Sequence, residues 1–193
     1  MSQKNTPRFA ARLNAFKIGS GAYWPGKNSI KTADILARAA TAGVNAADLN
    51  FPDHFVDESP ADLLRALKDN DIMLNGMAMR YYTEPSYKLG AFTHPNSTVR
   101  RAAIEETKRG LDVLAEMGGN LMTLWMGQDG FDYSFQMDYK RAWGDTIDAM
   151  IEVADHNPAI DIALEYKPNE PRSFALMPNA ATTLLAIKEI GRD

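Results

Sequence analysis

The chain alternates short apolar segments with longer amphipathic ones, and this alternation limits the folds open to it. The short segments have the length of β-strands, whereas the longer ones repeat their apolar residues with the period of a helix. Strands separated by helices pair in parallel, because the helical crossover returns the chain to the same end of the sheet. The pattern therefore predicts an α/β fold with a parallel sheet, either a barrel or a doubly wound layer.

Five strand–helix units can be traced along the 193 residues. Ser59 and Pro60 are suited to begin one helix, and Ser97 is suited to cap another. Asn179 and Gly191 are suited to begin and end the last helix. The predicted strands are 15–19, 46–51, 72–79, 121–125 and 160–165, and the predicted helices are 30–41, 61–69, 98–117, 135–155 and 180–190.

The number of units is too small for a closed barrel. A complete (β/α) barrel needs eight units and typically about 250 residues. No Gly-x-Gly-x-x-Gly follows the first strand and no Walker A loop occurs, so a nucleotide-binding sheet is disfavoured. Residues 1–14 are polar and predict a short arm or leader, and residues 15–193 are expected to form a partial barrel. Such a barrel would place its chemistry at the carboxyl ends of its strands.

The composition argues against several classes of partner and site. The net charge is −4, and no basic block is longer than a dipeptide such as Lys108-Arg109, which argues against a nucleic-acid surface. The absence of cysteine excludes disulfides and thiolate metal sites. No apolar stretch approaches the length of a membrane helix. We therefore expect a cytoplasmic protein that binds neither nucleic acid nor membranes.

The run Ala-Leu-Glu-Tyr-Lys-Pro-Asn-Glu-Pro-Arg at 163–172 carries the strongest chemical signal. Glu165 and Lys167 follow an apolar strand, and the two-residue period of a strand predicts that they point to the same side. A carboxylate beside an ammonium suits metal ligation together with activation of a substrate oxygen. A structural salt bridge at the strand end accounts for the same pair equally well.

This run resembles the Glu-x-Lys-Pro-x-Glu-Pro run of the xylose isomerase family, and other segments resemble that family in the same order. They are Tyr-Tyr-Thr-Glu-Pro at 81–85, Gly-Ala-Phe-Thr at 90–93 ahead of Val-Arg-Arg at 99–101, and Trp-Met-Gly-Gln-Asp-Gly at 125–130. The resemblance implies a TIM barrel, of which this chain would be the N-terminal part. It implies that Glu165 ligates a divalent metal and that Lys167 contacts a sugar oxygen. Trp125 and Tyr82 would line the sugar pocket.

One position departs from the family pattern. Asn50 stands where the family has the histidine that opens the cyclic sugar. We therefore assign Asn50 to substrate binding, and we expect His54 to be the catalytic candidate that reaches the pocket from a loop. An ordinary surface histidine is the competing interpretation of His54. For Trp125 and Tyr82 the competing interpretation is core packing, the commoner fate of large aromatic residues.

The resemblance implies an aldose–ketose isomerase that acts on a monosaccharide with Mg²⁺, Mn²⁺ or Co²⁺, cations that suit hard oxygen ligands. Lys167 favours isomerisation, since an epimerase would use two metal-bound carboxylates as acid and base. A sugar epimerase of the same superfamily and an inactive partial barrel that serves binding or assembly are the alternatives. An abasic-site endonuclease needs a histidine-rich zinc cluster, which three scattered histidines do not provide. Open sheet edges favour association, so we expect a homo-oligomer.

Overall fold

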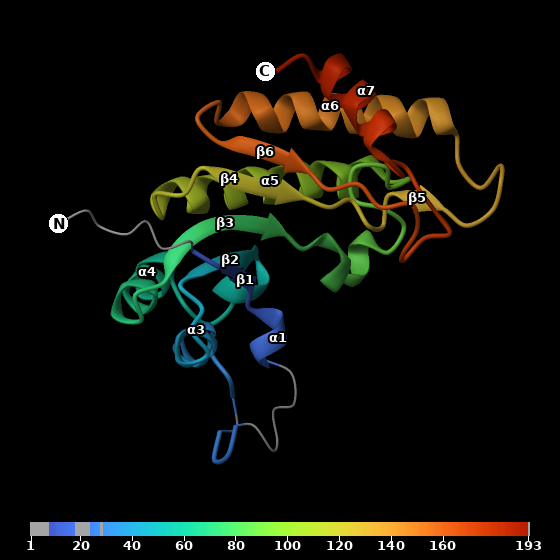
Figure 1. Ribbon diagram of the computed structural model, residues 1–193. Helices are drawn as coiled ribbons and strands as arrows, with labels where there is room; N and C mark the ends of the chain where they lie inside the picture. The colour runs from blue at the N-terminus through green and yellow to red at the C-terminus, as the bar shows by residue number, and fades with distance from the viewer. Residues whose placement is uncertain (1–7, 18–23, 28, 193) are drawn as a thin grey trace.

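Five parallel strands form the main sheet of the protein (Figure 1). The computed structural model describes residues 8–17, 24–27 and 29–192. The strands lie in the order in which they occur along the chain, and each pairs in parallel with its neighbour. They are β1 (Ala10–Arg12), β2 (Ala46–Phe51), β3 (Met73–Met79), β4 (Leu121–Leu124) and β6 (Asp161–Leu164). This order is that of a (β/α) barrel, and the barrel is not closed.

The sheet curves strongly. A flat sheet of five strands would hold its edge strands roughly 19 Å apart, four times the spacing of neighbouring strands. In the protein, Arg12 at the end of β1 forms a salt bridge of 2.9 Å with Glu165, which directly follows β6. Two side chains cannot span the flat distance, so the edges have curled toward each other, as they do in a barrel wall.

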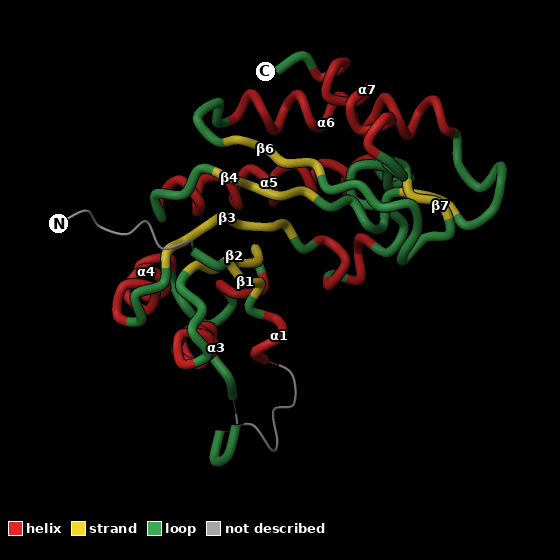
Figure 2. Tube along the Cα trace, viewed as in Figure 1, coloured by secondary structure: helices red, strands yellow, loops and turns green. Residues whose placement is uncertain are grey.

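Helices follow the strands in the predicted alternation (Figure 2). Helix α5 packs against β3, β4 and α6, while α6 also packs against α7 and α3 packs against α4. Within the described ranges, no helix is long and apolar enough to cross a membrane. The helices are α1 (Asn14–Lys17), α3 (Thr32–Thr41), α4 (Pro60–Asp69), α5 (Ser97–Glu116), α6 (Tyr139–His156) and α7 (Ala180–Ile190).

Local capping signals explain where these helices begin. Ser59 accepts a hydrogen bond from the backbone N–H of Asp62 at the start of α4, as predicted. Asn179 does the same for Thr182 at the start of α7. The predicted start of α5 was wrong by one residue, because Asn96 rather than Ser97 caps the helix and accepts a hydrogen bond from the backbone N–H of Thr98.

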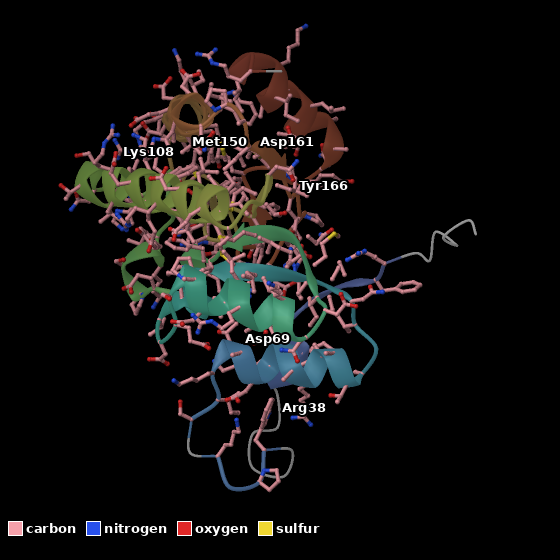
Figure 3. The ribbon with its side chains drawn as sticks, turned by 90° about the vertical axis from the view of Figure 1, so that its left-hand side faces the viewer. Arg38, Asp69, Lys108, Met150, Asp161 and Tyr166 are labelled. Carbon is pink, nitrogen blue, oxygen red and sulfur yellow. The ribbon has the colours of Figure 1, made fainter. Side chains whose placement is uncertain are left out.

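The core lies between the sheet and its helices (Figure 3). Fully or almost fully buried side chains come from the middle strands and from the inner faces of α3, α4, α5 and α6. Each large apolar side chain in this layer stabilises the fold by about 1.5–3 kcal/mol relative to an exposed one. Representative members are Leu36, Leu49, Leu63, Met77, Leu114, Met122 and Met150.

Two predicted elements begin elsewhere. The first strand is Ala10–Arg12 rather than 15–19, so part of the predicted arm belongs to the sheet; residues 15–17 lie in α1, and 18–19 fall outside the described residues. Helix α6 begins at Tyr139 rather than at 135, because Asp138 caps it. Phe135 has φ of +66°, which a right-handed helix does not accommodate.

A two-stranded antiparallel ribbon, β5 (Gly130–Phe131) with β7 (Phe174–Ala175), was not predicted. It joins the loop after β4 to the loop after β6. The rings of Phe131 and Phe174 stack with their centroids 5.2 Å apart. The ribbon therefore ties together the two loops that carry the Trp125 and Lys167 segments.

Leu114→Ala tests the position of the core. Leu114 is fully buried on α5, so the substitution should lower the free energy of unfolding by about 2–5 kcal/mol. Leu89→Ala is the matched control, because Leu89 is 53% exposed and its loss should cost less than about 1 kcal/mol. Urea unfolding followed by circular dichroism measures both; equal losses would contradict the assigned core.

Candidate active site at the carboxyl ends of the strands

The predicted site residues stand at or just beyond the carboxyl ends of the strands. Asn50 is the next-to-last residue of β2, Trp125 follows β4 and Glu165 follows β6. Tyr82 lies in the short 3-10 helix η2 (Tyr81–Thr83), which follows β3. Parallel strands have their carboxyl ends at the same end of the sheet, and barrel enzymes have their active sites there.

Aromatic and cationic side chains form a continuous row at the carboxyl ends of the strands. The ring centroids of Tyr82 and Trp125 lie 5.1 Å apart in an edge-to-face arrangement. The Nζ atom of Lys167 lies 5.0 Å from the centroid of Trp125, and the guanidinium carbon of Arg80 lies 4.3 Å from that of Tyr82. Cation–π attraction fixes each cation against its ring. Tyr82, Trp125 and Lys167, predicted separately from three loops, therefore form one surface.

Glu165 and Lys167 have different ionic partners. Glu165 Oε2 pairs with Arg12 Nη2 at 2.9 Å, and Lys167 Nζ pairs with Glu170 Oε2 at 2.7 Å. The strand ends at Leu164, so the two-residue period that predicted a shared side does not extend through this pair. Both side chains stay more than a third exposed, at 37% for Glu165 and 36% for Lys167. Both are thus accessible to a ligand at the strand ends.

His54 and Asn50 form a buried pair at the end of β2. His54 Nδ1 accepts a hydrogen bond of 3.0 Å from the backbone N–H of Asn50. His54 is only 5% exposed, and this burial, assisted by the charges of Lys17 and Arg80, lowers its pKa to about 4. A neutral imidazole whose Nδ1 is an acceptor carries its proton on Nε2. This geometry favours a role for His54 in holding the end of β2.

Asn50 itself is completely buried. Its Nδ2 donates a hydrogen bond of 2.9 Å to Oδ1 of Asn14. Its Oδ1 is buried and has no hydrogen-bond partner among the residues that the structure describes. A buried acceptor of this kind normally finds a donor, such as a hydroxyl group or a water molecule.

Two residues that we did not predict as functional hold the surrounding loops. The Arg172 guanidinium donates to the backbone oxygens of Gln128 and Lys88 and pairs with Asp132 at 2.9 Å. Asp129 is buried, and its carboxylate accepts hydrogen bonds from the backbone N–H groups of 91 and 93. Both lie in segments that carry the family resemblance, but their partners are distant in sequence, so no local pattern marks them.

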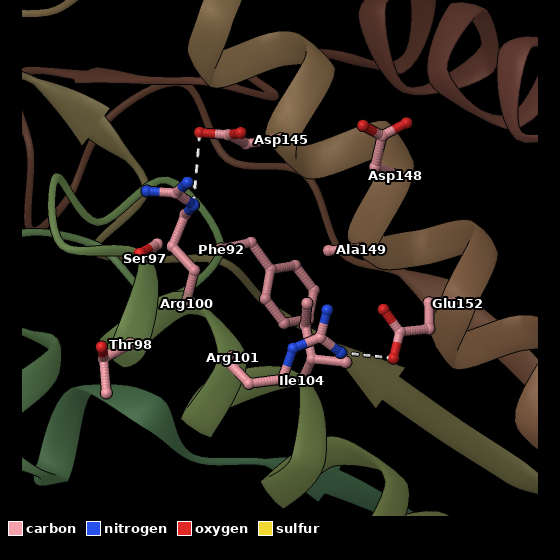
Figure 4. Close-up of a pocket in the computed structure, with 10 residues that line it drawn as sticks. All are labelled: Phe92, Ser97, Thr98, Arg100, Arg101, Ile104, Asp145, Asp148, Ala149 and Glu152. Atoms are coloured by element: carbon pink, nitrogen blue, oxygen red, sulfur yellow. Dashed lines mark hydrogen bonds and ion pairs between the residues drawn. The ribbon is translucent and has the colours of Figure 1, made fainter.

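Two cavities of the described structure lie outside the row of aromatic and cationic side chains. One of about 500 Å³ lies between α5 and α6, where Arg100 pairs with Asp145 and Arg101 with Glu152 (Figure 4). These wall charges already neutralise each other. A second cavity of about 340 Å³ lies beside β6, α6 and α7, at the open edge of the sheet. Neither contains a predicted site residue.

The donor set at the strand ends does not complete a divalent-cation site. No group of three or more His, Asp or Glu side chains in the described ranges is placed to hold a metal ion. Glu165 offers the hard carboxylate oxygen that Mg²⁺ or Mn²⁺ prefers, but it is a single ligand and is paired with Arg12. Further ligands would have to come from elsewhere.

The buried state of His54 makes a prediction for pH dependence. A folded pKa of about 4, below the ordinary 6.5, means that His54 favours the folded state above pH 6.5 and that this contribution is lost as the pH falls toward 4. The loss should reach roughly 3 kcal/mol in the free energy of unfolding. When it is measured by urea unfolding, the free energy of unfolding should therefore fall less between pH 7 and pH 4 in His54→Gln than in the wild type.

The control for this measurement is His94→Gln, which removes a histidine from a loop beyond the site. It should keep the acid decline of the wild type. If the free energy of unfolding fell with pH as much in His54→Gln as in the wild type, the buried neutral state of His54 would be contradicted.

Comparison with known proteins places this arrangement in a family. Residues 36–193 match the model of the xylose isomerase-like TIM barrel family. A xylose isomerase from Thermus thermophilus is 26% identical over 166 residues, which cover 81% of this chain and 43% of that protein.

Two solved structures share the fold. An AP endonuclease, family 2, from Brucella melitensis has a TM-score of 0.70 at 17% identity, with 97% of this chain and 66% of that chain covered. A D-psicose 3-epimerase from Clostridium cellulolyticum, solved with D-tagatose, has a TM-score of 0.65 at 18% identity, with 94% and 59% covered. The chain thus spans less than two thirds of each of these three relatives. Together with the five-stranded barrel wall, the family match shows that the chain belongs to the xylose isomerase-like TIM barrel family.

Proposed function

We propose that this chain carries the monosaccharide-binding half of a divalent-metal-dependent aldose–ketose isomerase site. The observation that supports the proposal most is the contact of Lys167 with Trp125 and of Trp125 with Tyr82 at the carboxyl ends of the strands. An aromatic wall beside an ammonium matches the two aspects of a sugar, a carbon face and polar oxygens. Family membership supports the choice of sugar chemistry.

Each residue has a proposed part in binding. Trp125 and Tyr82 pack against the carbon face of the sugar and exclude water. The Lys167 ammonium donates to the sugar oxygen on which negative charge develops. The buried Oδ1 of Asn50, which has no partner among the described residues, accepts a hydrogen bond from a water molecule that in turn binds a sugar hydroxyl. His54 acts as a positioning residue for Asn50 through its bond to the Asn50 backbone.

Glu165 is the proposed oxygen ligand for Mg²⁺, Mn²⁺ or Co²⁺. A cation of this type, when bound, polarises a carbonyl oxygen. Because no group of three or more His, Asp or Glu side chains in the described ranges is placed to hold a metal ion, further ligands would have to complete its coordination. A sugar-binding or assembly unit without turnover is the second candidate function.

Lys167→Ala tests the isomerase role. We expect turnover of an aldose panel, measured by NMR of the ketose product with Mn²⁺ present, to fall about 10²-fold or more. Mn²⁺ binding should be kept, because the ammonium is not a ligand. Lys188→Ala on α7 is the control and should leave turnover unchanged.

The outcomes separate the two candidate functions. Wild-type turnover in Lys167→Ala would refute the assigned role. Absence of turnover in the wild type, combined with sugar binding that weakens in Lys167→Ala, would support the binding unit instead.

We also propose that copies of the chain associate through the open edges of the sheet. Strand β6 is an edge of the described sheet, and beside it α7 exposes Leu184, Leu185 and Ile187. Unpaired backbone groups and exposed apolar side chains both favour association. Sedimentation velocity should therefore show a mass that rises with protein concentration. A constant monomer mass over the whole range would contradict association.

A further inference from the structure

Arg80 stands at one end of the row of aromatic and cationic side chains. It directly follows β3, and its guanidinium carbon lies 4.3 Å from the centroid of the Tyr82 ring. Its side chain is only 14% exposed. Contact with the ring uses the flat face of a guanidinium, whereas the N–H donors point outward in its plane. The ring of Tyr82 therefore holds these donors in place and leaves them available.

The donors of Arg80 lack partners among the residues that the structure describes. Its Nε atom is buried and donates no hydrogen bond, because Oδ2 of Asp53 lies 3.7 Å away, beyond hydrogen-bond distance. The other oxygen of Asp53 accepts a hydrogen bond of 3.1 Å from Oγ1 of Thr83. Within the described ranges, the two Nη atoms of Arg80 also have no acceptor, and they are not buried. A largely buried guanidinium with open donors is suited to bind an acceptor from solution.

The charge around Arg80 is positive on balance. Besides burial, the charges of Lys17 and Arg80 lower the pKa of His54, so both cations lie near the end of β2. Lys17 is exposed, and no described residue forms an ion pair with it. Asp53 is the carboxylate that pairs with Arg80, and only at long range. Two cations beside one carboxylate attract an anion to this end of the row.

We propose that Arg80 binds an anionic group of the substrate, so that the monosaccharide of this site is an acidic sugar that carries a carboxylate or a phosphate. The inference rests on the proposed function, because it takes Tyr82 and Trp125 to bind the sugar. A sugar that packs along these two rings has one end at Arg80. Lys167 at the other end is already paired with Glu170 at 2.7 Å. The planar guanidinium can donate two parallel hydrogen bonds to either anion.

The test compares the dissociation constants of three sugars, measured by NMR titration of the full chain: glucose, glucuronate, and glucose phosphorylated on its primary hydroxyl. The wild type should bind at least one of the acidic sugars about tenfold more tightly than glucose. In Arg80→Gln this preference should fall to about twofold or less. Because the preference is a ratio, a general loss of affinity through a disturbed Tyr82 ring does not remove it. The acid that is preferred identifies the anion.

Two further variants complete the design. Arg65→Gln removes an exposed arginine from α4 with the same change in net charge, and it should keep the preference of the wild type. Asp53→Asn removes the carboxylate beside Arg80, so it should increase the preference for the acidic sugar. Circular dichroism confirms folding of each variant. Should Arg80→Gln fold poorly, Asp53→Asn alone tests the inference.

The outcomes separate this inference from the proposed function. If glucose and both acidic sugars bind equally to the wild type, or if Arg80→Gln keeps the preference, the role of Arg80 is refuted and the sugar-binding surface stands. An unchanged preference in Asp53→Asn would also overturn the role of Arg80. If none of the three sugars binds, the proposed function is itself refuted.

Discussion

The parallel pairing of consecutive strands is the constraint on which the rest of the structure depends. The five strands β1, β2, β3, β4 and β6 all run in one direction, so their carboxyl ends lie at the same end of the sheet. Residues from loops far apart in sequence are thereby brought within contact distance, and the curl of the sheet brings even its two edges together through Arg12 and Glu165. The strands of the barrel wall fix the positions of the loops, and the loops carry most of the candidate site residues.

The sequence predicted best those elements that local signals define. Strand β2 and helices α4 and α7 lie where apolar pattern, caps and terminating residues placed them. Strand β1 was misplaced because Ala10–Arg12 is a short edge segment with little apolar character, and its position depends on pairing with β2. The β5–β7 ribbon depends on contacts between loops some forty residues apart in sequence, which a local pattern does not encode.

The candidate site divides in the same way. Tyr82, Trp125 and Lys167 were predicted from motifs, and the structure brings them into one row. The partner of Glu165 was not predicted, because Arg12 belongs to the segment interpreted as an arm. The environment of His54 could not be read from the sequence either, since its burial depends on packing at the end of β2. Residue type and spacing indicate chemistry, whereas charge balance and burial come from the tertiary fold.

The surface formed by Tyr82, Trp125 and Lys167 is proposed to bind a monosaccharide. The most direct measurement is an NMR titration of the indole N–H signals, since the chain has three tryptophans and Trp125 alone stands at the site. Addition of a monosaccharide should shift the Trp125 signal in a saturable manner and leave those of Trp24 and Trp143 in place. An unmoved Trp125 signal, or equal and unsaturable shifts of all three, would contradict the claim.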